Sequence, residues 1–121
     1  MHIFKSCFYL KLTSRLEVSF ETVELRDLCE DEFLAAEKLG SEIAESLKHR
    51  LSDLFAADSI HDVLVGRPAL GMFNGRECLR IELAGTCCMT MVPNHSSPRA
   101  NANGATNWDL VRRLMLVSLG D

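Results

Sequence analysis

The stretch 41–57, SEIAESLKHRLSDLFAA, constrains the fold of this chain more than any other. Its apolar residues recur three and four positions apart, which places them on one stripe of a helix, while charged residues take the opposite side. The stripe consists of Ile43, Ala44, Leu47, Leu51, Leu54 and Phe55. A stripe this apolar must be covered, and the alternating runs after residue 68 predict a sheet that covers it.

Two further helical segments precede this stretch. Thr22 is the predicted N-cap of a short helix, and Asp31 begins a second helical segment. Gly40 either ends that second helix or lies within a longer helix that runs to Ala57. The apolar row continues across the glycine and favours the longer helix. Either arrangement makes residues 22–57 a helical hairpin.

Alternating or continuously apolar runs predict up to five strands. They are 16–20, 70–73, 77–84, 86–92 and 111–119. Asn74-Gly75 is a strong signal for a two-residue hairpin turn. The last two runs are apolar on both faces, which is typical of central strands. The fold class we expect is α+β, with the N-terminal helical hairpin packed on a mainly antiparallel sheet of four or five strands.

With 121 residues, of which 47% are hydrophobic, the chain is long enough for one domain with a real core. We expect that domain to span residues 16–121 and regard residues 1–15 as a poorly defined N-terminal extension. No apolar run reaches the ~18 residues of a membrane helix, and the N-terminus does not resemble a secretory signal. Five cysteines without a CxxC pair indicate reduced thiols in a cytoplasmic protein rather than a zinc site or a disulfide framework. We therefore expect no metal and no cofactor.

Charge is distributed unevenly along the sequence. The formal net charge is −4, but residues 17–60 carry 12 acidic and 4 basic residues, whereas residues 61–121 carry 5 acidic and 6 basic residues. An acidic helical half beside a weakly basic sheet half is not a strong nucleic-acid footprint. If the chain binds nucleic acid, we expect the second half to do so.

The order of strand, helical hairpin and strand meander resembles the RelE/ParE toxin superfamily. The detailed sequence resembles its HigB-type plasmid maintenance system killer proteins over about residues 16–121. The matching features are the helix end LSDLFAADSI, Gly66-Arg67, Val92-Pro93 and the closing segment NWDLVRRLMLVSLGD.

The resemblance implies a toxin of a type II toxin–antitoxin system that cleaves mRNA on the ribosome without a metal. Its partners would be a cognate antitoxin, usually a helix-turn-helix protein, together with the ribosome and mRNA. In such enzymes a ribose 2′-hydroxyl attacks its own 3′-phosphate. That reaction needs a base, an acid and cations that face the phosphate.

The sequence departs from the family in three places. The strand after Gly85 usually carries an aromatic residue followed by Arg, where this chain has Cys87-Cys88. A His usually follows Gly-Arg by two positions, where this chain has Pro68-Ala69, and many members end in Asp-Tyr-His, where this sequence ends at Asp121. An alternative is therefore a degenerate toxin-fold protein that binds an antitoxin or a protein target without cleaving RNA. A structural or interaction domain with a chance resemblance is a third alternative.

The candidate site residues fall into two groups. The candidate catalytic residues are Arg67, Arg80, His61, His95 and Asp121. The candidate RNA-binding residues are Arg76, Arg99, Arg112 and Arg113.

Each candidate also has a structural interpretation that involves no site. Arg80 also suits a cross-strand pair with a carboxylate, and His61 and His95 also suit exposed loop positions. Arg112 and Arg113 are adjacent in a predicted strand, so at most one of them faces the active side of the sheet.

Overall fold

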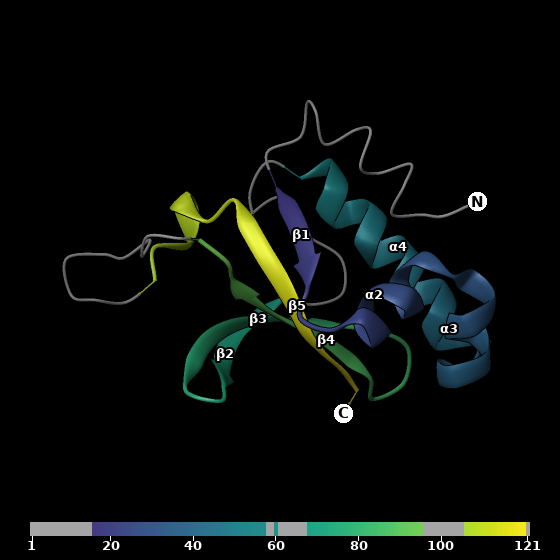
Figure 1. The fold of residues 1–121 in the computed structure, drawn as a ribbon. Helices are drawn as coiled ribbons and strands as arrows, with labels where there is room; N and C mark the ends of the chain where they lie inside the picture. Colours follow the sequence, from purple (N-terminus) through teal and green to yellow (C-terminus); the bar gives the residue numbers. More distant parts are fainter. Residues whose placement is uncertain (1–15, 58–59, 61–67, 96–105, 121) are drawn as a thin grey trace.

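A computed structural model describes residues 16–57, 60, 68–95 and 106–120 of the chain. Within these residues the architecture is α+β, with three α-helices gathered on one side of a five-stranded mixed sheet (Figure 1). The helices are α2 (Val23–Glu30), α3 (Glu32–Leu39) and α4 (Ser41–Ala56). The strands are β1 (Glu17–Phe20), β2 (Ala69–Phe73), β3 (Arg76–Glu82), β4 (Cys88–Pro93) and β5 (Arg113–Gly120). The predicted extension 1–15 lies outside the described residues.

Side-chain caps begin the first two helices. The Thr22 hydroxyl accepts a hydrogen bond from the backbone N–H of Leu25 at 3.2 Å. One carboxylate oxygen of Asp31 accepts from the N–H groups of Phe33 and Leu34 at 3.0 and 3.1 Å. Both predicted helix starts are confirmed, because each cap satisfies N–H groups that have no partner within the helix.

Gly40 breaks the helical region. Its φ of 92° and ψ of 154° lie outside the helical range, so the prediction of one helix running through it is wrong. The alternative, in which Gly40 ends the helix, is correct. Its N–H donates to Ala36 O at the end of α3, and its carbonyl accepts from Ala44 N at the start of α4, both at 3.0 Å. Apolar periodicity continues across the break because α3 and α4 both face the same core.

The strand order in the sheet is β1-β5-β4-β3-β2. The β5–β4, β4–β3 and β3–β2 pairs are antiparallel, and β1 runs parallel to β5. The predicted central position of β4 and β5 is confirmed. Asn74 and Gly75 have φ values of 50° and 80°, as a two-residue turn between β2 and β3 requires, which confirms that hairpin.

The two faces of the sheet differ in what covers them. One face packs against the apolar stripe of α4 in the main core, whose fully buried members include Leu51, Ile81, Met89, Leu114 and Leu116. The opposite face, here called the outer face, carries a smaller cluster to which no described helix residue belongs. That cluster consists of Cys78, Val92 and Val117, with Phe73 and Met115 packed against it. On this face the members of the cluster and Thr90 are buried, whereas Arg80 and Arg113 are exposed.

The conformation of Gly40 predicts a stability effect. We expect Gly40→Ala to lower the free energy of unfolding by about 1–3 kcal/mol, because only glycine adopts this φ and ψ without strain. Urea denaturation followed by circular dichroism measures the change. Gly71→Ala is the matched control, since its added Cβ would lie at an ordinary 3.8 Å from the Cys78 sulfur. Equal stability of the two variants would contradict the assignment of the break.

An exposed ion pair between α3 and α4 predicts a pH effect. The Nζ of Lys48 lies 2.8 Å from a carboxylate oxygen of Glu32. This hydrogen bond and the charge of Lys48 lower the pKa of Glu32, and the same contacts with Glu32 raise the pKa of Lys48. The carboxylate's stabilising contribution is thus present above its ordinary pKa and is lost as pH falls through the lowered one.

An NMR titration of the Glu32 carboxyl carbon tests this ion pair. We expect the pKa of Glu32 to rise in Lys48→Met and to rise partly in high salt, because both groups are exposed and screened by ions. Arg26→Met, on α2, is the control. An unchanged Glu32 pKa in Lys48→Met would show that the contact does not persist in solution.

Candidate functional site

The candidate site is built on the outer face, where residues in register form rows across the strands. Arg80 on β3 lies opposite Thr90 on β4, and Thr90 lies opposite Ser118 on β5. The next row is apolar and contains Val92, which lies opposite Met115. Polar groups of the outer face therefore lie on either side of an apolar centre.

Arg80 stands in the first polar row and is exposed. Its Nη2 donates to the backbone carbonyl of Met72 on β2 at 3.4 Å, whereas the sequence suggested a carboxylate as the alternative partner. A long bond at an exposed position is weak and exchanges readily with solvent or another acceptor. The guanidinium is therefore held near the outer face without being committed to a buried partner.

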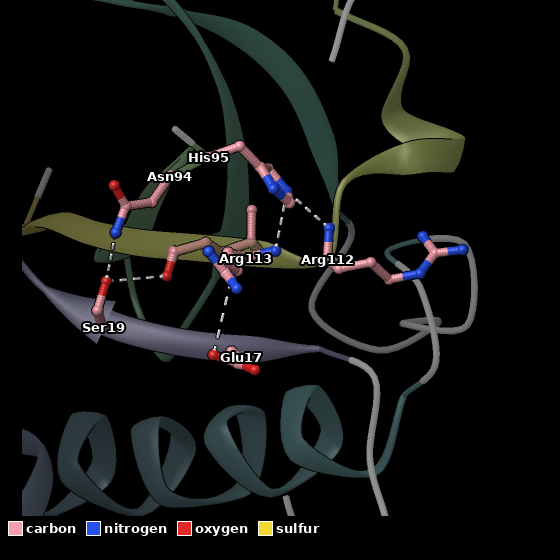
Figure 2. A network of polar contacts seen from close by, with 7 residues as sticks. Glu17, Ser19, Asn94, His95, Arg112 and Arg113 are labelled. Atoms are coloured by element: carbon pink, nitrogen blue, oxygen red, sulfur yellow. Dashed lines mark hydrogen bonds and ion pairs between the residues drawn. The ribbon is translucent and has the colours of Figure 1, made fainter. Parts of the chain in front are cut away.

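His95 is the centre of a polar network at the far end of the sheet, where β4 ends and β5 begins (Figure 2). Its Nε2 accepts hydrogen bonds from the backbone N–H groups of Arg112 and Arg113 at 3.0 and 3.2 Å. An acceptor nitrogen carries no proton, so these bonds assign the neutral ring to the Nδ1–H tautomer. Nε2 can take up a proton only if both backbone bonds break.

Asn94 extends this network to the edge strand β1. Its backbone N–H donates to Arg113 O at 2.9 Å, and its side-chain amide donates to the Ser19 hydroxyl at 3.1 Å (Figure 2). The Ser19 hydroxyl in turn donates to Leu114 O at 3.4 Å. Asn94 and His95 together thus fix the relative positions of β4, β5 and β1.

Three of the predicted RNA-binding arginines converge on this end of the sheet. Arg113 lies opposite Glu17, with 3.9 Å between its Nε and a carboxylate oxygen. Arg76, at the start of β3, reaches across to donate from Nη2 to Pro93 O at 3.3 Å. Arg112 directs Nη1 to the carbonyl of Val111 at 3.1 Å. Two carboxylates among the described residues also lie at this end, Glu17 beside Arg113 and Glu77 next to Arg76, and Glu77 accepts hydrogen bonds from Thr106.

The structure thus places the predicted residues in two groups and leaves some outside. Arg76, His95, Arg112 and Arg113 come together at the end of the sheet, whereas Arg80 lies four residues along β3 from Arg76, about 13 Å at the rise of a strand. Arg113, the first residue of β5, is exposed, whereas Arg112, directly before the strand, is half-buried. The remaining candidates lie outside the described residues: His61, Arg67, Arg99 and Asp121.

Sequence reasoning missed the contributions of Ser19 and Asn94. Asn94 directly follows Pro93, and a proline marks the end of a strand. An amide side chain at a strand end was therefore the feature of the sequence that could have indicated this hydrogen bond. The partner of that amide lies 75 positions away and comes beside it only because β1 joins the sheet next to β5.

The cysteines occupy several environments. Cys87 is buried in the helix-side core, whereas Cys88 is half-buried and in register with Glu82 and Gly120. Burial raises the pKa of the Cys29 thiol to about 12, and the charge of Glu30 adds to the effect, so Cys29 stays protonated at neutral pH. Among the residues with described positions, no group of three or more His, Cys, Asp and Glu side chains could hold a metal.

The described helices are also too short or too polar to cross a bilayer. In comparisons with known proteins, no family model, no curated protein and no solved structure matches this chain.

The acceptor role of His95 predicts a matched pair of variants. We expect His95→Leu to lower the free energy of unfolding by about 1–3 kcal/mol, because it leaves two backbone N–H groups without their acceptor. His95→Gln retains an oxygen acceptor near the position of Nε2, so it should recover part of the loss. Urea denaturation measures both variants. Equal losses in the two variants would show that hydrogen-bond acceptance is not the role of His95.

Proposed function

We propose that this chain is a RelE/ParE-fold toxin of a type II toxin–antitoxin system and that it cleaves mRNA on the ribosome. Support comes from the sequence resemblance and from one structural observation that carries the proposal. The outer face of the sheet bears exposed arginines on β3 and β5, while the acidic helices lie on the opposite side. On the outer face the exposed Arg76, Arg80 and Arg113 outnumber the exposed Glu17 and Glu82, which favours an anionic ligand such as RNA.

In this proposal the arginines bind the RNA backbone. Arg76 and Arg113 contact phosphate groups of the RNA at the end of the sheet. Arg80, about 13 Å from Arg76 along β3, contacts another part of the RNA backbone. An arginine that faces the scissile phosphate stabilises the charge that develops on its oxygens during attack.

The reaction we propose is transfer of the phosphoryl group within the RNA. The ribose O2′ attacks the adjacent phosphorus and loses its proton to a base, while an acid protonates the departing O5′. Arg67, His61 and Asp121 are the proposed groups for these steps. His95 acts as a positioning residue, since its Nε2 holds the backbone of Arg112 and Arg113.

The partners in this function are an antitoxin, the ribosome and mRNA, and the location is the cytoplasm. An antitoxin, encoded alongside and built on a helix-turn-helix domain, would bind the toxin and keep it inactive. The ribosome would present the mRNA, and both would be met in the cytoplasm.

A second candidate function is favoured by a specific observation. Cys88 stands in the sheet where the resemblance places an arginine, in register with Glu82, and so adds no positive charge. The net charge of −4 also opposes binding to RNA. A toxin-fold protein that holds an antitoxin or a protein target without cleaving RNA is consistent with these features.

Mapping mRNA 5′ ends after induced expression in a bacterium tests the first function. We expect new ends within translated codons, and we expect Arg80→Gln to reduce their frequency at least tenfold because a phosphate-facing cation is lost. Arg26→Gln, which removes an exposed arginine from α2, should cleave like the unaltered chain.

Three other outcomes are informative. Growth arrest without new mRNA ends would reject cleavage and support the second function. If Cys88→Arg then produced new ends, the missing strand arginine would be the cause of inactivity. Equal cleavage by Arg80→Gln and the unaltered chain would reject the proposed role of Arg80.

A further inference from the structure

Strand β2 forms an uncharged edge of the sheet. Its sequence, ALGMF, contains no charged residue and no proline, and its only partner among the described strands is β3 (Figure 1). Leu70 and Met72 are 57% and 58% exposed. Natural edge strands usually carry charges, proline or bulges that prevent pairing with another strand. β2 has none of these protections.

The register shows which backbone groups of β2 face outward. Phe73 and Arg76 flank the two-residue turn, so they form a hydrogen-bonded pair, and the pairs alternate from there. The N–H and C=O groups of Leu70 and Met72 therefore point away from β3. The hydrogen bond from Arg80 to the Met72 carbonyl agrees with this, because that carbonyl is not used within the sheet.

The opposite edge of the sheet is protected. β1 has only four residues, includes the exposed Glu17, and is held by the ion pair of Glu17 with Arg113. A like-charge clash would oppose pairing of two such edges. Within the part of the chain that the structure describes, β2 is therefore the edge at which another strand can add.

We propose that β2 pairs antiparallel with β2 of a second copy of this chain, about a two-fold axis through Gly71. In that register Leu70 lies opposite Met72 of the second copy, and Met72 lies opposite its Leu70. Both pairs have outward N–H and C=O groups, so each exchanges two hydrogen bonds when the Arg80 guanidinium, which donates to the Met72 carbonyl at 3.4 Å in the single copy, turns away from it. The two exposed side chains of each copy then cover each other.

The charges and the symmetry of β2 favour a second copy of this chain as its pairing partner. Each copy carries a net charge of −4, yet the meeting strands carry none, so no like charges face each other at the axis. Ala69 lies opposite Phe73 of the second copy, which brings Arg80 of one copy to the same face as that ring. An arginine over an aromatic ring is attractive, and the symmetry supplies this contact twice.

The symmetry also closes the assembly. A two-fold pair uses the β2 edge of both copies and leaves only β1 edges, so it does not extend into a fibre. A single strand pair buries less than a standard interface, so the dimer is reversible and depends on concentration. This inference is independent of RNA cleavage.

Sedimentation velocity across a concentration series tests the dimer. We expect the apparent mass to double as concentration rises, and Leu70→Lys and Met72→Lys to remain monomeric at every concentration. Val23→Lys introduces the same charge on α2 at a site that is also 58% exposed, and it should dimerise like the unaltered chain. Circular dichroism confirms that each variant is folded.

Amide hydrogen exchange distinguishes this dimer from any other. We expect the amides of Leu70 and Met72 to exchange about tenfold more slowly at concentrations where the dimer forms, because they become hydrogen bonded. Gly71 and Phe73, which already bond to β3, should not change. A chain that stays monomeric throughout the series, or a dimer that leaves both amides unprotected, would overturn the proposal.

Discussion

Packing of α4 against one face of the sheet is the interaction on which the rest of the structure depends. Its buried leucines and Phe55 share a single core with residues from β1, β3, β4 and β5. A buried leucine contributes about 1.5–3 kcal/mol relative to an exposed one, so exposing this stripe of α4 would cost several times that amount. All three described helices are thereby confined to one side, and the arginines of β3 and β5 remain on the other.

A second constraint acts at the end of the sheet. β1 precedes the helices in the chain but joins the sheet beside the last strand, and the pairing is parallel. Ser19, Asn94 and His95 hold this junction through side chains that bond to the backbone of β5 or to one another. The same junction carries Arg112 and Arg113, so the local structure that closes the fold also positions the cations of the candidate site.

Much of the fold could be predicted because the spacing of apolar residues and the residue types at turns and caps are local properties of the sequence. The stripe of α4, the caps at Thr22 and Asp31, the hairpin at Asn74-Gly75 and the central positions of β4 and β5 all follow from short windows of sequence. The longer helix was preferred to a break at Gly40 because apolar spacing continues across the glycine, and spacing does not report φ. A glycine between two good helical windows is the better signal.

The candidate site was less predictable, for a physical reason. Residue type and spacing identify Arg76, Arg80, Arg112 and Arg113 as cations, but which of them share a location depends on register between strands distant in sequence. The acceptor role of His95 depends on backbone N–H groups 17 and 18 positions away. A contact between a side chain and distant backbone groups does not depend on which side chains the partner residues carry, so the sequence does not indicate it.

The central claim is that the outer face binds RNA, and NMR titration tests it most directly. The labelled protein is titrated with a short RNA whose ribose 2′-hydroxyls are methylated, so that it cannot be cleaved. We expect shifts of the Nε–Hε signals of Arg76, Arg80 and Arg113 that weaken as salt rises. Shifts confined to α2, α3 and α4, or no shifts at low salt, would contradict it.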